Sequence, residues 1–157
     1  MCTGSGCIAI SVDKMCEMAD VTAVDISDKA LEVARENNHI NDGKVKFILS
    51  DLFENVDGEF DIIISNPPYI KSSELPTLQQ EVQFEPELAL DGGEDGLMFY
   101  RALKDNWFPF LNSGGLMVLE CGENQSKDIL EMFLETAKGA KFIKDGQDIE
   151  RIVVLKK

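Results

Sequence analysis

The sequence predicts an α/β fold with a Rossmann-like, doubly wound and mostly parallel sheet that ends in an antiparallel hairpin. Helical and strand patterns alternate along most of the chain, as expected when each strand is followed by a helix that crosses back over the sheet. Several strands are unbroken apolar runs, which is typical of parallel strands covered on both faces. A glycine-rich turn comes directly before the first helix, where folds of this class bind ligands. The length of 157 residues suits one domain.

The N-terminal part of the chain alternates helices with strands. After the turn at residues 3–6, apolar side chains recur at helical spacing from Ile8 to Met15 and on toward residue 19. Residues 21–25 form a short apolar strand that ends in an acid, and Ser27 can cap the next helix. The apolar side of that helix consists of Ala30, Leu31, Ala34 and Ile40. Residues 45–49 and 60–64 are further strands, separated by a turn at residues 57–58.

The C-terminal part begins with a loop that runs from residue 66 to about residue 96 and is marked by prolines and glycines. The pattern then predicts a helix over 97–111, ended by the glycines at 114 and 115, and a strand over 116–119. A helix over 124–137 follows, with Ile129, Leu130, Phe133 and Leu134 inward. Residues 141–144 and 149–155 are β segments whose short connection forces antiparallel pairing.

Charge and composition disfavour several classes of function. The 15 Lys and Arg against 29 Asp and Glu give a net charge of −14, which repels a phosphate backbone and disfavours nucleic acid as the main partner. The 4 cysteines lack CxxC spacing and His39 is the only histidine, so we expect no metal and reduced thiols. Neither a membrane helix nor a signal pattern is found, so we expect a cytoplasmic protein with no membrane partner.

The turn Thr3-Gly4-Ser5-Gly6 is a candidate cofactor-binding loop. It opens a loose G-x-G-x-x-A pattern, and Asp25 follows about twenty residues later at the end of the next strand. Glycines let the backbone approach a ligand, helix N–H groups bind polar atoms, and an acid in this place accepts hydrogen bonds from ribose hydroxyls. The pattern favours a nucleoside-containing cofactor, with a purely structural turn as the alternative.

The segment Asn66-Pro67-Pro68-Tyr69 is the candidate catalytic site. An apolar strand delivers it to the same sheet edge as the glycine turn. The Asn66 side chain and the Pro67 backbone each offer a carbonyl oxygen, on a chain whose φ angles are locked by proline. These acceptors can hold both hydrogens of a planar amino group, and Tyr69 offers a face for stacking. Because the nitrogen lone pair of such a group is delocalised, acceptors that favour its pyramidal form stabilise the transition state. A rigid turn without a catalytic role is the alternative.

Together these residues resemble class I S-adenosylmethionine-dependent methyltransferases, and within them the release factor glutamine-N5 methyltransferases of the HemK/PrmC family. The resemblance covers nearly the whole chain. The segments that also match are Phe84-Glu85-Pro86, Leu88-Ala89-Leu90, Gly92-Gly93, Asp95-Gly96-Leu97, Arg101 and Glu120-x-Gly122-x-x-Gln125.

The resemblance implies methyl transfer from S-adenosylmethionine to the side-chain amide nitrogen of a glutamine in a peptide chain release factor. The implied catalytic residues are Asn66, Pro67, Pro68 and Tyr69. The implied cofactor-binding residues are Thr3, Gly4, Ser5, Gly6, Asp25, Ile26, Asp51, Leu52 and Asn66.

The sequence departs from that family at its start. The family has a strand that ends in an acid before the glycine loop, and an N-terminal helical domain that helps to recognise the protein substrate. This sequence begins at Met1, and Cys2 stands where a glycine is usual. We therefore expect residues 1–157 to be a methyltransferase domain without the substrate-recognition domain and the first central strand. An oligomer or strand exchange would compensate for that strand.

Other functions remain open at this point. An adenine-N6 nucleic-acid methyltransferase uses the same four-residue corner on another planar amino group, but it predicts a basic face and base flipping. An inactive cofactor-binding fragment is a further alternative. A dinucleotide oxidoreductase fits the glycine loop and gives no reason for the Asn-Pro-Pro-Tyr corner.

Overall fold

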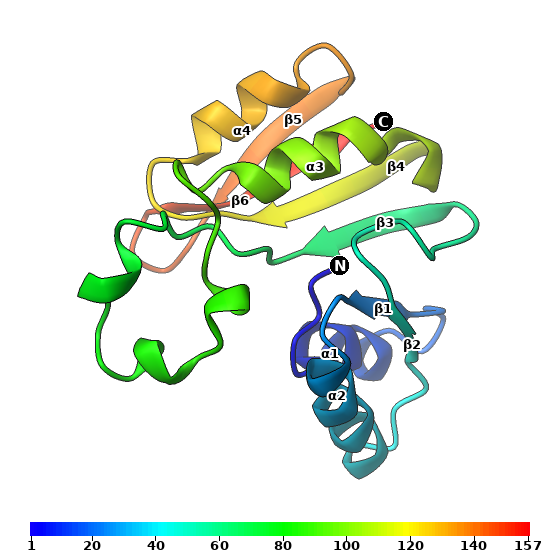
Figure 1. Cartoon of the computed structure of the whole chain (residues 1–157). Coiled ribbons are helices and arrows are strands. Elements are labelled where there is room, and N and C mark those ends of the chain that lie inside the picture. Colours follow the sequence, from blue (N-terminus) through cyan, green and yellow to red (C-terminus); the bar gives the residue numbers. More distant parts are fainter. The chain divides into compact units, whose positions relative to one another are not determined.

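The computed structural model describes all 157 residues and divides into two compact units, Met1–Asp57 and Gly58–Lys157. The strands pair in two sheets, one of β1 (Thr22–Asp25) and β2 (Lys46–Leu49), and one with the order β3-β4-β6-β5. Figure 1 labels the elements of each unit. The predicted α/β class is confirmed, with its strands distributed over two sheets. None of the helices has the length and apolar character needed to cross a membrane.

In the first unit, α1 (Cys7–Met15) precedes β1, and α2 (Asp28–Ile40) connects β1 to β2. The two strands are parallel, with Thr22 beside Lys46 and Asp25 beside Leu49. The predicted cap of α2 is present, because the Ser27 hydroxyl accepts a hydrogen bond from the Ala30 N–H at 3.2 Å. The core of the unit comprises Ile10, Ala23, Leu31, Ala34 and Val45. Asp25 therefore stands at the carboxyl end of β1, a strand whose two middle residues are buried.

In the second unit, β3 (Phe60–Ser65) lies at a sheet edge and pairs in parallel with β4 (Leu111–Glu120). Strand β6 (Glu150–Lys156) lies between β4 and β5 (Gly139–Lys144) and is antiparallel to both. This confirms the predicted C-terminal hairpin. Helices α3 (Met98–Asn106) and α4 (Ser126–Phe133) lie along the same side of this sheet (Figure 1).

The core of the second unit is built around Trp107. This side chain is fully buried, and its ring meets the ring of Phe133 edge-on with centroids 5.7 Å apart. Tyr100 of α3 is also fully buried, and its hydroxyl donates to the Glu120 carbonyl at 2.7 Å. This bond attaches α3 to the end of β4, so the position of Glu120 is fixed by the core.

The predicted long loop lies between β3 and α3. It contains short 3-10 helices at Leu75–Thr77, Val82–Phe84 and Glu87–Ala89, and it returns to its start through a parallel bridge between Ile70 and Asp91. Figure 1 shows its middle part, in green, extending away from the sheet of this unit. The two ends of the loop are thus held together beside the end of β3.

Some predicted element limits are wrong. Helix α3 ends at Asn106 rather than at residue 111, because Pro109 lacks an N–H group and disfavours helical geometry in the residue before it. Strand β4 then begins at Leu111, with a register shift opposite β3 before Leu116. Helix α4 is shorter than predicted, and Leu134, expected to point inward, is 62% exposed.

The predicted burial of the strands on both faces is also wrong. Leu49 of β2 is 47% exposed and Ile62 of β3 is 54% exposed. In the second unit, α3 and α4 cover one side of the sheet, which leaves alternate residues of β3 more accessible. An apolar run therefore does not reveal which of its faces is covered.

Candidate active site

The glycine loop of the first unit is held by backbone hydrogen bonds. The Thr3 N–H donates to the Val24 carbonyl at 3.0 Å, and the Gly6 N–H donates to the Thr3 carbonyl at 2.9 Å. Gly4 and Gly6 have φ angles of 52° and 81°, a region that favours glycine. Gly6 caps α1, and no side chain caps the first turn of that helix. The N–H groups at the start of α1 are therefore available to polar atoms of a ligand.

Asp25 lies directly against this loop. One carboxylate oxygen accepts the Gly4 N–H at 2.8 Å, and the other accepts the Ser27 N–H at 2.9 Å. These bonds fix the carboxylate plane at the end of β1. Each oxygen keeps a lone pair for a further donor, which is the arrangement needed to bind a pair of neighbouring hydroxyls. Ile26, the next residue, is 51% exposed and offers an apolar surface beside the carboxylate.

Asp51 and Leu52 follow β2, the strand beside β1. Asp51 is exposed, whereas Leu52 is half-buried with φ 43°. Ser50 was not singled out from the sequence, yet it is buried and its N–H donates to the Asp25 carbonyl at 2.9 Å. Its hydroxyl donates to the Leu52 carbonyl at 3.1 Å and accepts from the Asn55 N–H at 2.9 Å. Ser50 thus attaches the turn that carries Asp51 and Leu52 to the strand that carries Asp25.

The Asn66-Pro67-Pro68-Tyr69 corner belongs to the second unit and follows β3. Pro67 and Pro68 are buried, whereas the side chain of Asn66 is exposed. The corner is therefore anchored by its prolines, and the Asn66 carbonyl oxygen remains available to a ligand. The role of Asn66 as a hydrogen-bond acceptor stays a prediction.

Tyr69 is half-buried, and its hydroxyl donates to a Glu120 carboxylate oxygen at 3.5 Å. Burial, together with the nearby Glu120 carboxylate, raises the pKa of the Tyr69 phenol. The phenol therefore stays protonated at neutral pH, so it can donate to Glu120. This contact orients the ring that was predicted to stack on the substrate amide.

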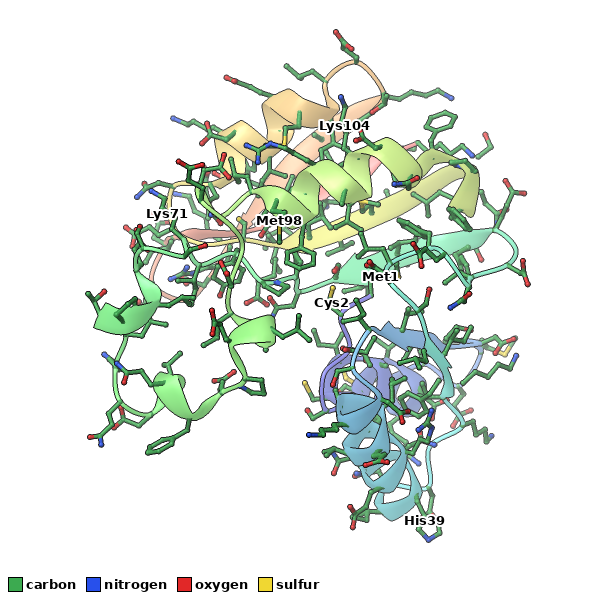
Figure 2. The ribbon with its side chains drawn as sticks, in the orientation of Figure 1. Met1, Cys2, His39, Lys71, Met98 and Lys104 are labelled. Atoms are coloured by element: carbon green, nitrogen blue, oxygen red, sulfur yellow. The ribbon has the colours of Figure 1, made fainter.

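The predicted site residues thus form two groups. The glycine loop, Asp25 and the turn with Asp51 are joined within Met1–Asp57. The segment Asn66–Tyr69, called the proline corner below, lies in Gly58–Lys157. His39 is exposed near the end of α2, and Figure 2 shows it at the opposite end of the first unit from Cys2. No three His, Cys, Asp or Glu side chains come together in a way that could hold a metal ion.

Comparison with known proteins identifies the family. Residues 1–93 match the methyltransferase small domain family. The chain belongs to this family. A release factor glutamine methyltransferase from Thermodesulfovibrio yellowstonii is 38% identical over 161 residues, covering 100% of this chain and 58% of the relative. A ribosomal protein uL3 glutamine methyltransferase from Francisella tularensis is 42% identical over 128 residues, covering 80% of this chain and 41% of the relative. The chain spans about half the length of the curated relatives it matches.

Solved structures show the same fold for this member of the methyltransferase small domain family. A methyltransferase from Pyrococcus furiosus has a TM-score of 0.76 and 24% identity, covering 99% of this chain and 71% of the other. A ribosomal protein L11 methylase from Lactobacillus delbrueckii has a TM-score of 0.67 and 23% identity, covering 99% and 65%. The Rossmann-like methyltransferase fold predicted from the sequence is confirmed.

Proposed function

We propose that residues 1–157 form a methyltransferase domain that transfers a methyl group from S-adenosylmethionine to the side-chain amide nitrogen of a glutamine in a peptide chain release factor. The observation that carries the proposal is the exposed Asn66 side chain on a corner anchored by buried prolines, at the carboxyl end of β3. The names of several curated relatives support a protein glutamine as the acceptor.

The first unit fits the nucleoside part of S-adenosylmethionine. Gly4 has no atom within 4 Å of the position a Cβ would take, so the loop leaves room for a ligand to approach its backbone. The Asp25 carboxylate has its plane fixed by the Gly4 and Ser27 N–H groups, and in this proposal its oxygens accept hydrogen bonds from ribose hydroxyls. In this proposal Thr3, Ser5 and Gly6 complete the loop, Ile26 and Leu52 contact the adenine, and Asp51 accepts from it.

The second unit fits the amide that receives the methyl group. S-adenosylmethionine, when bound, supplies an electrophilic methyl group on a positively charged sulfur. The Asn66 side-chain oxygen and the Pro67 carbonyl oxygen accept the two N–H groups of the substrate amide, while the Tyr69 ring supports its plane. As nitrogen takes the methyl group, these acceptors hold the hydrogens of the increasingly positive nitrogen, which lowers the barrier. The bond between the methyl carbon and the sulfur breaks as the N–C bond forms, and its electron pair stays on the sulfur. One of the amide protons then passes to solvent water, which restores a neutral amide.

The identity of the protein substrate is the finer part of the proposal. We place a release factor first and ribosomal protein uL3 second, because relatives carry both names. A chain of net charge −14 favours basic partners. The same charge disfavours adenine in DNA as the acceptor. Release factors and ribosomal proteins act in translation, so we also propose that the chain works in the cytoplasm.

The test is a methyl-transfer assay with labelled S-adenosylmethionine. Unmethylated release factor, uL3 and duplex DNA are offered separately, and labelled peptides are sequenced to find the modified residue. We expect label on a glutamine of the release factor, and we expect Asn66→Ala to reduce the rate about 100-fold. Asn106→Ala is the matched control, because Asn106 is exposed and its side chain bonds only to Ala102 within α3. Label on DNA alone would reject the proposal, and label on uL3 alone would change the substrate.

The assembly state can be tested in the same preparation. We propose that two copies of the chain associate, since dimers are the commonest oligomers of soluble proteins. Light scattering during size exclusion should then give twice the mass of 17.5 kDa. A mass equal to one chain at all concentrations rejects this part of the proposal and leaves the methyl-transfer proposal unchanged.

A further inference from the structure

The Gln125 side chain makes an unusual set of contacts around Tyr69. Its amide N–H groups donate to the Tyr69 carbonyl at 3.0 Å and to the Gly96 carbonyl at 3.3 Å. Its carbonyl oxygen accepts the Gly122 N–H at 2.9 Å. One side chain beside the start of α4 therefore joins the proline corner, the end of the long loop and the turn after β4.

Glycines make this close packing possible. A Cβ on Gly96 would lie 2.4 Å from the Tyr69 carbonyl oxygen and 2.6 Å from the Gln125 side-chain nitrogen, and Gly96 has φ 76°. A Cβ on Gly92 would lie 2.7 Å from the Tyr69 Cα, and one on Gly122 would lie 2.8 Å from the Gln125 side-chain oxygen. A side chain at Gly92 or Gly96 therefore requires a shift of the Tyr69 backbone, and one at Gly122 requires the Gln125 side chain to move.

The backbone after Tyr69 is fixed by the same loop. The Ile70 N–H donates to the Leu90 carbonyl at 3.0 Å, and the Gly92 N–H donates to the Ile70 carbonyl at 2.7 Å. At the other end of the tyrosine, the hydroxyl contacts Glu120, which precedes Gly122 on β4 and its turn. Tyr69 is therefore held at its carbonyl, at the next residue and at its ring.

We propose that Gln125 is a positioning residue whose amide holds the Tyr69 carbonyl, and through it the Asn66–Tyr69 corner, in the geometry that receives the substrate amide. This rests on the proposed function for the role of the corner, whereas the contacts themselves do not depend on it. Reacting groups tolerate little displacement, and a shift of about 1 Å can cost 100-fold in rate. Without Gln125 the Tyr69 carbonyl loses its donor, so the corner is free to shift while its prolines remain.

The first test measures the contacts and needs no activity. Hydrogen–deuterium exchange is followed at the Ile70, Gly92 and Gly122 N–H groups of the full chain. Gln125→Ala should speed exchange at all of these sites by about tenfold or more. Gln125→Glu keeps an oxygen for the Gly122 N–H but loses both donors, so exchange should rise at Ile70 and Gly92 and stay slow at Gly122. The control Gln147→Glu makes the same charge change on an exposed side chain and should change none of them.

The second test separates positioning from general stability. In the methyl-transfer assay, Gln125→Ala and Gln125→Glu should lower kcat about 10- to 100-fold. The dissociation constant for S-adenosylmethionine and the folded fraction by circular dichroism should stay within about twofold of wild type, because all the proposed cofactor residues except Asn66 belong to the other unit. In Gly96→Ala the added Cβ displaces the Tyr69 carbonyl, so this variant should also lower kcat without a change in cofactor affinity or folded fraction. Gly146→Ala should not, since no atom lies within 4 Å of its Cβ position.

The possible outcomes distinguish the two proposals. Unchanged exchange at Ile70 and Gly92 in both Gln125 variants overturns the proposed role of Gln125, whether or not the chain is active. A kcat that falls only in step with the folded fraction or with cofactor binding also overturns it. If wild type transfers no methyl group to any protein, the proposed function fails, and the exchange pattern still decides whether Gln125 holds the corner. If Gln125→Ala does not fold, Gln125→Glu and Gly96→Ala carry the same comparison.

Discussion

Replacing Asp25 by Asn tests whether the first unit binds S-adenosylmethionine through this carboxylate. The carboxylate accepts the Gly4 N–H at 2.8 Å on one oxygen and the Ser27 N–H at 2.9 Å on the other. A carboxylate offers about four lone-pair positions, so about two remain, one on each oxygen. These match the two hydroxyls of a ribose. An Asn side chain has one oxygen, and its NH₂ group would face the N–H of either Gly4 or Ser27.

The magnitude follows from this arrangement. Asp25→Asn removes one internal acceptor and one acceptor for the ligand, and it leaves a donor facing a donor. A hydrogen bond to a charged group contributes about 1.5–3 kcal/mol. The free energy of unfolding should therefore fall by about that amount. Since 1.4 kcal/mol is tenfold in affinity, the dissociation constant for S-adenosylmethionine should rise about 10- to 100-fold.

The assay is isothermal titration calorimetry with S-adenosylmethionine, with urea unfolding in parallel. Asp28→Asn is the matched control, because Asp28 lies in the same unit and makes the same charge change, and its contact with Arg35 at 3.7 Å is exposed. If the loss of one negative charge alone weakened the binding of the cationic S-adenosylmethionine, both variants would lose the same affinity. The reasoning is refuted if Asp25→Asn binds within twofold of wild type, or if Asp28→Asn loses as much affinity.

Two further predictions concern stability and reactivity. Gly6→Ala should lower the free energy of unfolding in urea more than Gly4→Ala does. Both substitutions introduce strain of about 1–2 kcal/mol, because both glycines have left-handed φ angles. Only the Cβ on Gly6 also meets the side chains of Ala34 and Ile10, at 3.1 and 3.2 Å. Equal losses would contradict this. Burial raises the pKa of the Cys121 thiol to about 11, so at pH 8 it should react with a disulfide reagent far more slowly than the exposed Cys7. In the unfolded chain this thiol ionises near its usual pKa of 9.0. Its contribution to the free energy of unfolding is therefore present below pH 9 and is lost as pH rises toward 11. A free energy of unfolding that stays constant over that pH range would contradict this.

The order of elements was predictable because it depends on local periodicity and capping. The Ser27 cap, the parallel strands and the C-terminal hairpin all have local signals, and each is confirmed. Limits and burial were less predictable. The end of α3 is set by Pro109, a local signal that the apolar pattern around Trp107 obscured. The exposure of Ile62 and Leu134 depends on which faces other elements cover, and this is decided by contacts distant in sequence.

The candidate site was predictable where the sequence carries a recognised spacing. The contact between Gly4 and Asp25 follows from the glycine loop and the acid at the next strand end. Cys2 also stands where the resembled family has glycine, and its φ of 52° lies in the region that favours glycine. By contrast, the contact between Gln125 and Tyr69 spans 56 residues of sequence. The resemblance marked Gln125 as part of a motif, but only the structure shows what its amide contacts.

The glycines of the two units have different surroundings, and under the proposed function this difference separates cofactor binding from catalysis. Gly4 leaves open space beside a fixed carboxylate, so an added methyl group there would occupy the approach of a ligand. Gly96 has no such space, and its Cβ would press on the Tyr69 carbonyl that Gln125 holds. Gly4→Ala should therefore weaken S-adenosylmethionine binding at an unchanged kcat under saturation. Gly96→Ala should lower kcat at an unchanged cofactor affinity. If both variants change only kcat, or both change only the affinity for S-adenosylmethionine, the glycine loop and the proline corner do not bind separate partners. The assignment of Asp25 to the cofactor and of Asn66 to the substrate amide is then wrong.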